Sequence, residues 1–281
     1  MLNKRQQTIL QYVNERGEAT NAELATLIGD CSAMTLWRDL TKLENEGRIV
    51  RYRGGAASVG GEEAGQSQEI NFMRRARQNV ADKEAIAQIA AALILPEHTH
   101  FLDAGSTVLT LLKFLRSGNY NFTTSATNIA SELAQHPSYD VTMLGGQLNS
   151  NTLSCSGPQT ERMLREINID IAVMATSGYA AGSGFTSGRL TESELKRNVI
   201  EKAALTIMLF DHAKLTRRHP FTFAALEDID VLIADRALSD DFSAACRKND
   251  VQVFSPEDGL SEEERVRVFK EILRKKDPFR T

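Results

Sequence analysis

The chain has 281 residues, a formal net charge of −4, 42% hydrophobic residues and 25% charged residues. This length allows two domains with sizeable cores, and the composition excludes a disordered chain. The sequence has no apolar run near the roughly 18 residues of a membrane-spanning helix and no apolar signal region at its start, so we expect a cytoplasmic protein that does not bind membranes.

The cysteines and histidines predict no metal and no cofactor. Cys31, Cys155 and Cys246 are widely separated, and no histidine lies at metal-ligand spacing from them. We therefore expect reduced thiols. The acidic net charge also argues against a protein that coats nucleic acid indiscriminately.

Residues 1–56 predict a helix-turn-helix domain. Lys4 to Arg16 is a short amphipathic helix, and Thr20 with Glu23 forms a capping box for a second helix. Ser32 is the expected cap of a third helix that runs to about Glu46. The apolar faces of the second and third helices are Leu24, Leu27 and Ile28, and Leu36, Leu40 and Leu43.

The third helix carries side chains that need a reason to face outward. At 100° per residue, Met34 and Arg38 lie opposite the leucine stripe and Trp37 lies on its flank. A solvated face explains Arg38 but not an outward Met34, whereas insertion into a DNA major groove explains both. The candidate DNA-binding residues are Ser32, Met34, Thr35, Trp37, Arg38, Lys42, Arg51 and Arg53.

Residues 48–55 predict a two-stranded wing, because apolar and basic residues alternate there before a glycine turn. Arg51 and Arg53 are expected to project together. Residues 57–70 then have the small and polar composition of a flexible linker. We expect Arg74, Arg75 and Arg77, which follow it, to lie on a solvated or domain-docking face.

The N-terminal pattern resembles the DeoR family of bacterial transcription regulators. The resemblance is carried by Glu23-Leu24-Ala25, by Ser32-x-x-Thr35-Leu36-x-Arg38-Asp39-Leu40 and by the closing Arg51-Tyr52-Arg53-Gly54-Gly55-Ala56. Two features depart from the family pattern. Trp37 stands where an arginine is common, and the turn Gly29-Asp30-Cys31 is one residue longer than usual.

Residues 71–255 predict an α/β domain, in which short apolar runs alternate with helical segments. The runs are 99–103, 122–125, 141–144, 170–175, 205–210, 230–234 and 251–253. The first of them ends at Asp103-Ala104-Gly105-Ser106-Thr107, before a helix predicted from Val108 to Leu115. Backbone amides at this turn favour an anion site, but capping of the helix by Ser106 or Thr107 explains the residues as well.

The large domain resembles the DeoR-family C-terminal sensor domain, whose mostly parallel sheet is similar to that of ribose-5-phosphate isomerase. By that resemblance Gly105, Ser106 and Thr107 bind a phosphate, Asp103 and Asp211 meet sugar hydroxyls, and Lys196 and Lys214 neutralise charge. Thr124, Ser125, Gly145 and Gly146 complete the candidate site, although Gly145-Gly146 also reads as a turn and Lys196 with Glu192 as a surface i, i+4 pair. Thr124-Ser125-Ala126 departs from the Thr-Asn-Ser usual in the family.

These observations predict a transcription regulator that binds operator DNA as a homodimer or homotetramer and responds to a phosphorylated sugar or related metabolite, most simply as a repressor of carbohydrate metabolism. An isomerase-like enzyme with a DNA-binding appendage is the alternative, for which Glu192 or Glu194 is the available base. Constitutive DNA binding without a ligand is a third possibility. The tail, 256–281, predicts a helix from Ser261 to Lys275 that packs on the sensor domain or on a second subunit.

Overall fold

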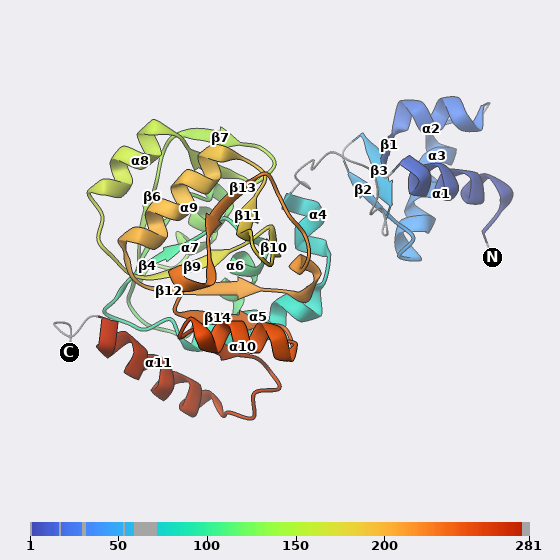
Figure 1. The fold of residues 1–281 in the computed structure, drawn as a ribbon. Coiled ribbons are helices and arrows are strands. Elements are labelled where there is room, and N and C mark those ends of the chain that lie inside the picture. The colour runs from blue at the N-terminus through green and yellow to red at the C-terminus, as the bar shows by residue number, and fades with distance from the viewer. Residues whose placement is uncertain (1, 17, 30–31, 53, 59–71, 277–281) are drawn as a thin grey trace. The chain divides into compact units, whose positions relative to one another are not determined.

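The computed structural model describes residues 2–16, 18–29, 32–52, 54–58 and 72–276. They fall into two compact units, Met1–Gln66 and Ser67–Thr281, which we call the N-terminal and C-terminal units and describe separately (Figure 1).

The N-terminal unit is a three-helix domain with a small antiparallel sheet. Its helices are α1 (Lys4–Arg16), α2 (Asn21–Ile28) and α3 (Ala33–Asn45). Its strands are β1 (Glu18–Thr20), β2 (Ile49–Tyr52) and β3 (Gly55–Ser58), in the order β1-β3-β2. The predicted capping box is confirmed, since Thr20 Oγ1 accepts from the Glu23 amide at 3.2 Å and Glu23 Oε2 from the Thr20 amide at 2.7 Å.

Two predictions for this unit are wrong. Leu27 does not belong to the buried face of α2, because its side chain is exposed. Of the three residues predicted for that face, Leu24 is the one that is fully buried. The linker does not begin at Ala57, since Ala57 and Ser58 are buried residues of β3, and Ser58 Oγ donates to Asn14 Oδ1 at 2.7 Å. Ala57 and Ser58 pair with β2, so the wing extends two residues beyond the point where the sequence becomes small and polar.

A parallel sheet organises the C-terminal unit. In the described part of the chain it has seven strands in the order β15-β14-β12-β9-β4-β5-β6, and every neighbouring pair is parallel. All seven correspond to predicted apolar runs. They are β4 (Thr99–Leu102), β5 (Tyr120–Thr124), β6 (Tyr139–Met143), β9 (Ile169–Ala175), β12 (Ala203–Phe210), β14 (Val231–Ala234) and β15 (Gln252–Phe254).

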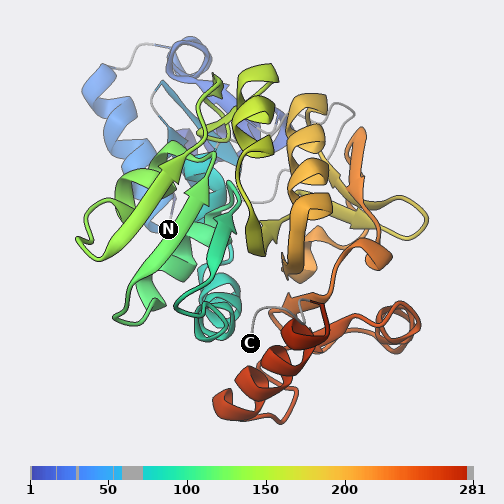
Figure 2. The same cartoon turned by 90° about the vertical axis from the view of Figure 1, so that its left-hand side faces the viewer.

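Helices cover both faces of this sheet (Figures 1 and 2). Alternate side chains of β9 enter different cores, Ile171 and Val173 on one face and Ala172 and Met174 on the other. The first core is closed by α5 (Val80–Ala92), α6 (Ser106–Leu111), α7 (Thr127–Leu133) and α11 (Glu262–Lys276). The second is closed by α8 (Pro158–Arg165), α9 (Leu190–Lys202) and α10 (Asp240–Lys248).

Several short elements were not predicted from the sequence. They are the helix α4 (Phe72–Arg77), the hairpin of β7 (Gln147–Asn149) and β8 (Ser154–Ser156), and a sheet of β10 (Gly178–Ala180), β11 (Gly184–Ser187) and β13 (Phe221–Ala224). Single 3₁₀ turns occur at η1 (Leu112–Phe114), η2 (His212–Lys214) and η3 (Leu226–Asp228). The unpredicted strands are short and lack the continuous apolar run that marks the equally short strands β4, β14 and β15.

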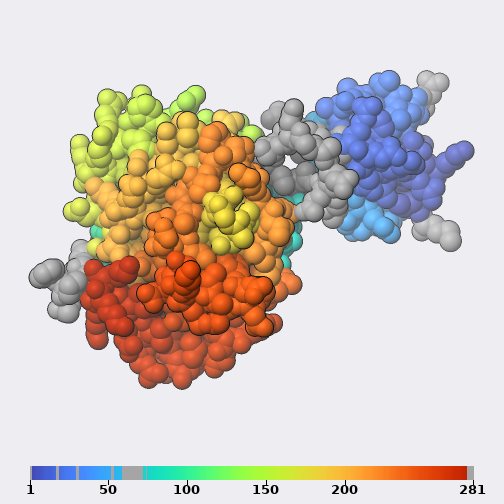
Figure 3. Space-filling view, in the orientation of Figure 1, coloured from blue at the N-terminus to red at the C-terminus, as the bar shows by residue number. Residues whose placement is uncertain are grey.

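The C-terminal helix packs on its own chain. Its predicted capping box is present, with the Glu264 amide donating to Ser261 Oγ at 3.2 Å and the Ser261 amide to Glu264 Oε2 at 2.7 Å. Phe269 and Leu273 on one face of α11 are buried in the core shared with α5 and the sheet. The helix therefore packs onto this unit, and its outer face, coloured red, is visible on the surface (Figure 3). The tail is therefore not a separate element after residue 255.

Candidate functional site

The outer face of α3 carries large apolar side chains in solvent. Met34 and Trp37 are 60% and 52% exposed, and Arg38 and Lys42 are also exposed, while Leu36, Leu40 and Leu43 are buried. The predicted orientation of this helix is thus confirmed. An exposed methionine and tryptophan beside basic side chains provide apolar and phosphate-binding groups on one surface.

The start of α3 is fixed by its own hydroxyls. Ser32 Oγ accepts from the Thr35 amide at 3.2 Å and lies 2.9 Å from Thr35 Oγ1. This cap sets the direction in which the first turn leaves the preceding loop. Asp30 and Cys31, where the sequence predicts a longer turn, lie outside the described residues.

Arg51 joins the wing to α3. Its Nη1 donates to Thr41 Oγ1 at 2.6 Å, and its guanidinium lies 5.3 Å from the centre of the Trp37 ring. Arg51 therefore lies against the helix surface that the wing flanks. Arg53, its predicted companion, lies outside the described residues.

A buried carboxylate on the inner side of α3 holds the helix to α1. Asp39 accepts hydrogen bonds from Arg5 Nε and, at 2.8 Å, from Gln6 Nε2. Burial by itself raises the pKa of Asp39, but the hydrogen bonds from Arg5 and Gln6 outweigh it and hold that pKa below its ordinary value. No local pattern indicates this contact, because it joins residues more than thirty positions apart.

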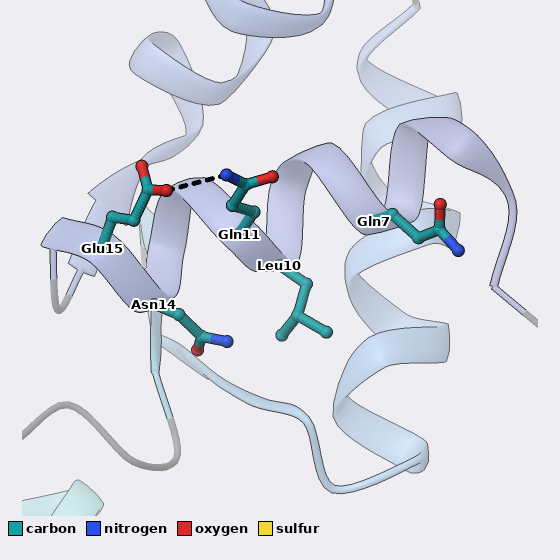
Figure 4. Close-up of a pocket in the computed structure, with 5 residues that line it drawn as sticks. All are labelled: Gln7, Leu10, Gln11, Asn14 and Glu15. Atoms are coloured by element: carbon teal, nitrogen blue, oxygen red, sulfur yellow. Dashed lines mark hydrogen bonds between the residues drawn. The ribbon is translucent and has the colours of Figure 1, made fainter.

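A shallow hollow runs along α1 (Figure 4). Its lining is mostly carboxamide, and Gln11 Nε2 donates to Glu15 Oε1 at 2.8 Å within it. Gln7, Leu10, Gln11, Asn14 and Glu15 line it. This set holds one carboxylate and no cation, so the hollow has no chemistry for an anion.

A second pocket lies at the carboxyl ends of three adjacent strands, β4, β9 and β12, which we call the strand-end pocket. Its volume is about 30 Å³. It is lined by Arg75, Ala104, Gly105, Ser106, Thr107, Ala175, Thr176, Ser177, Glu192, Lys196, Leu209, Asp211 and Lys214. Parallel sheets bind ligands at this edge, because strand ends and helix starts converge there.

The turn after β4 forms one wall of this pocket. A Cβ on Gly105 would lie 2.7 Å from Ala175 Cβ, so glycine is required where β4 and β9 end side by side. Gly105 is the N-cap residue of α6, and within the described residues no side chain caps this helix. The capping interpretation of Ser106 and Thr107 is therefore wrong.

A buried ion pair contributes to the lining of the pocket through Lys196. Lys196 Nζ donates to Asp103 Oδ2 and, at 2.9 Å, to the Ala175 carbonyl, and lies 3.6 Å from Glu192 Oε1. Burial by itself lowers the pKa of Lys196, but the carboxylates of Asp103 and Glu192 outweigh it and raise that pKa above its ordinary value. The i, i+4 pair of Glu192 and Lys196 is present, but it is buried and not on the surface.

The upper part of the pocket carries less satisfied polar groups. Asp211 is 4% exposed, and its Oδ1 has no hydrogen-bond partner among the residues that the structure describes. Lys214 Nζ lies 4.0 Å from the other carboxylate oxygen. Burial lowers the pKa of Lys214, although the Asp211 carboxylate opposes that change.

Arg75 of α4 is the pocket residue that the sequence placed elsewhere. We expected it on a solvated or docking face, yet it lines the pocket, and its Nε and Nη2 are buried with no hydrogen-bond partner in the described part of the chain. Lys83 of α5 lies behind it and donates to the carbonyls of Arg75 and Gln78. Burial lowers the pKa of Lys83 to about 8.

Five predicted site residues are not among those that line the strand-end pocket: Asp103, Thr124, Ser125, Gly145 and Gly146. Thr124 Oγ1 donates to the Leu102 carbonyl at 2.6 Å, which joins β5 to β4. Gly146 has φ of 150°, and a Cβ there would overlap the Thr160 hydroxyl, which itself donates to the Gly145 carbonyl at 2.7 Å, so the Gly145-Gly146 pair packs closely against α8. Asp170 lies at the start of β9, where it accepts from the Thr99 amide at 2.6 Å.

No helix in the described part of the chain has the length and apolar character needed to cross a membrane. In the same part, no three His, Cys, Asp or Glu side chains gather in a way that suits a metal ion.

Two family models match the chain. The DeoR-like helix-turn-helix domain matches residues 5–61, and the DeoR C terminal sensor domain matches residues 78–236.

Curated relatives match most of the chain. The HTH-type transcriptional regulator GolR of Listeria innocua is 31% identical over 84% of this chain and 91% of its own length. The HTH-type transcriptional repressor GlcR of Bacillus subtilis is 29% identical over 89% of this chain and 94% of its own length. The L-fucose operon activator of Haemophilus influenzae is 28% identical over 89% of this chain and 98% of its own length. Among solved structures, ribose 5-phosphate isomerase A of Methanocaldococcus jannaschii matches 50% of this chain and 56% of its own at 15% identity and a TM-score of 0.36.

Proposed function

The chain belongs to the DeoR family of transcription regulators, and from this premise we propose that it represses a carbohydrate operon and leaves its operator when a phosphorylated sugar binds at the strand-end pocket, which widens from its volume of about 30 Å³ to admit the ligand. The pocket's mixture of cations, hydroxyls and an unpartnered carboxylate is the observation that carries the proposal. Residues 1–58 read the DNA, and residues 72–276 bind the effector.

The operator side of the proposal rests on the exposed face of α3. Arg38 and Lys42 supply cations for phosphates, and Met34 and Trp37 supply apolar surface for base edges. One winged helix reads few base pairs, so two or four copies on repeated half-sites provide the affinity of a specific complex. Because the operator is the partner, we propose that the protein acts in the cytoplasm.

The effector side rests on chemistry that matches both ends of a sugar phosphate. Arg75 and Lys214 offer charge-assisted donors to a phosphate. Asp211 Oδ1 accepts a hydrogen bond from a sugar hydroxyl, and the hydroxyls of Ser106, Thr107 and Ser177 lie along the same lining. Relatives whose names refer to sugars, such as the L-fucose operon activator, support this ligand class.

We propose that the pocket binds its ligand without turning it over. Glu192 and Glu194 are the carboxylates that an isomerase-like reaction could use as a base. Of the two, Glu192 lines the pocket, and it lies 3.6 Å from the Lys196 ammonium. An adjacent cation stabilises the carboxylate form and weakens it as a base. Conversion of ribose 5-phosphate or a hexose phosphate by the purified protein would contradict this part of the proposal.

A gel-shift titration with DNA from upstream of the protein's own gene tests the function. We expect a specific complex whose affinity falls steeply with salt, and release of the DNA by at least one member of a sugar-phosphate panel. Arg38→Ala serves as the DNA-binding control. Absence of a specific complex contradicts the regulator, and a complex that no sugar phosphate dissociates favours constitutive binding.

A further inference from the structure

We propose that Trp37 and Arg51 read the operator as one unit, in which Trp37 positions the guanidinium of Arg51 to bind the edge of a guanine. The inference rests on the proposed function and deepens it, because it assigns part of the sequence specificity to a side chain of the wing that α3 holds in place.

The first support is the contact between the two side chains. The Arg51 guanidinium lies 5.3 Å from the centre of the Trp37 ring, which is within the range of a cation–π interaction. Trp37 is 52% exposed, so much of the ring lies in solvent beside this arginine. Stacking on an aromatic face orients the planar guanidinium, and a bidentate contact with a base depends on that orientation.

The second support is a chain of two hydrogen bonds that fixes the direction of Arg51. Its Nη1 donates to Thr41 Oγ1 at 2.6 Å, and the Thr41 hydroxyl donates to the Trp37 carbonyl at 2.8 Å. Because a hydroxyl has one proton, this arrangement leaves the Thr41 oxygen as an acceptor for the arginine. A guanidinium has five N–H donors, and the bond to Thr41 uses one of them, so a bidentate contact with a base can form from the others.

The third support is the attachment of β2 to the same side of α3. The Arg51 amide donates to Glu44 Oε1 at 3.2 Å. Trp37, Thr41 and Glu44 are spaced i, i+4 and i+7, so they form one stripe along α3. This stripe therefore holds Arg51 through both its backbone and its guanidinium.

The stripe borders the exposed face of α3. Met34 lies three residues before Trp37, Arg38 lies three residues before Thr41, and both side chains are exposed. The Arg51 guanidinium therefore joins the surface that we propose binds DNA. An arginine that is oriented before binding loses less side-chain freedom on contact, and arginine bound to O6 and N7 of guanine is the commonest base-specific contact.

Fluorescence tests the contact in the free protein, because Trp37 is the single tryptophan of the chain. We expect acrylamide to quench Trp37 more strongly in full-length Arg51→Gln than in the wild type, since the guanidinium no longer covers the ring. Arg48→Gln is the matched control, because Arg48 is an exposed arginine directly before β2, and its quenching should equal that of the wild type. Equal quenching in the wild type and Arg51→Gln overturns the stacked unit.

Selection from a pool of random DNA duplexes tests the reading of a base. The full-length wild type and each variant are incubated with the pool, and sequencing of the bound fraction gives the base preference at each position. We expect Arg51→Gln to lose roughly fivefold to a hundredfold of the preference for guanine at one position of each half-site and to keep the preferences elsewhere. Arg48→Gln should keep the whole profile of the wild type.

Two conservative variants separate positioning from charge. Trp37→Leu is expected to reduce the preference at the same position as Arg51→Gln, whereas Trp37→Phe keeps an aromatic face and should retain most of it. Arg51→Lys keeps the charge but not the planar fork, so it is expected to lose the guanine preference while its affinity for an arbitrary duplex stays close to that of the wild type. This variant also decides the matter if Arg51→Gln does not fold.

Arg51→Gln that binds every duplex more weakly but keeps the base preferences of the wild type assigns Arg51 to a phosphate and overturns the proposal. A lost guanine preference in Arg51→Gln with an unchanged profile in Trp37→Leu overturns the positioning role of Trp37. Failure of the proposed function gives a different result, since a wild type that enriches no sequence has no base preference to lose, and it contradicts the regulator together with this reading of a base.

Discussion

The outer face of α3 and the strand-end pocket use charged side chains in opposite ways. Arg38 and Lys42 lie in solvent on a helix that is held from its other side by Asp39. In the pocket, Lys196 and Asp211 are 3% and 4% exposed. The Asp103 and Glu192 carboxylates raise the pKa of Lys196, and the Asp211 carboxylate opposes the lowering of the Lys214 pKa by burial. If α3 binds DNA as proposed, its charges are therefore expected to act almost independently, whereas those of the pocket act as one set.

This difference indicates how each region responds to change. An exposed charge is solvated in every state, so its removal affects only the partner that it meets. A buried pair loses its compensation when one member is removed, and the fold itself is destabilised. The following experiments, from the largest expected effect to the smallest, sharpen or contradict this contrast.

Lys196→Met is expected to lower the free energy of unfolding of the C-terminal unit by about 3–5 kcal/mol, because it leaves the buried Asp103 carboxylate without its cation. Urea unfolding followed by circular dichroism measures the change. Lys275→Met, an exposed lysine of α11, is the control. A loss no greater than that of the control would show that the pair is not a structural unit.

Arg38→Ala is expected to weaken specific DNA binding by about 1–3 kcal/mol without altering the thermal stability of either unit, because its side chain is exposed on α3. Fluorescence anisotropy with labelled operator DNA gives the affinity, and Lys275→Ala provides the comparison. If stability falls together with DNA binding, the two regions do not differ in the way proposed.

Asp39→Asn is expected to destabilise the N-terminal unit by about 1 kcal/mol at neutral pH, since the hydrogen bonds from Arg5 and Gln6 lose their charged acceptor. The folded-state pKa of Asp39 lies below its ordinary value of 3.8, so its stabilisation is present above that pH and is lost as the pH falls through the folded pKa. Urea unfolding at neutral and acidic pH, followed by fluorescence of the single tryptophan, measures both effects. Glu46→Gln, an exposed carboxylate, should not show the pH dependence.

The smallest expected effect is a fall in anion affinity of roughly threefold as the pH rises through about 8, where Lys83 loses its proton. Deprotonation removes one positive charge near Arg75, Lys214 and Asp211. Sulfate is the suitable probe because its own charge is constant over this range, and calorimetry at several pH values gives the affinity. Lys83→Arg keeps the charge and is expected to flatten the profile; an unchanged profile would assign the titration to another group.

Local patterns in the sequence were sufficient for the helices of the N-terminal unit, for the seven strands of the central sheet and for the turn that forms one wall of the pocket. The Thr20 capping box, the leucine stripe of α3 and the apolar runs of the seven parallel strands depend on residues a few positions apart, which share one face of a helix or strand. The same holds for the turn at Gly105, because a small-residue break between a strand and a helix is visible along the chain. The outward orientation of Met34 follows from helical spacing alone.

Tertiary structure decided which charges meet. β4 and β9 are neighbours in the sheet although four strands, β5 to β8, lie between them in the chain. This pairing places Asp103 where Lys196 of α9 can bind it, and β12, on the other side of β9, carries Asp211 to the same edge. The place of Arg75 depends on how the six-residue helix α4 packs at that edge. The local sequence shows only a run of basic residues, which does not predict which of them lines the pocket. Spacing along a chain fixes the direction of a side chain within its own element, whereas the groups it meets depend on how distant elements pack together.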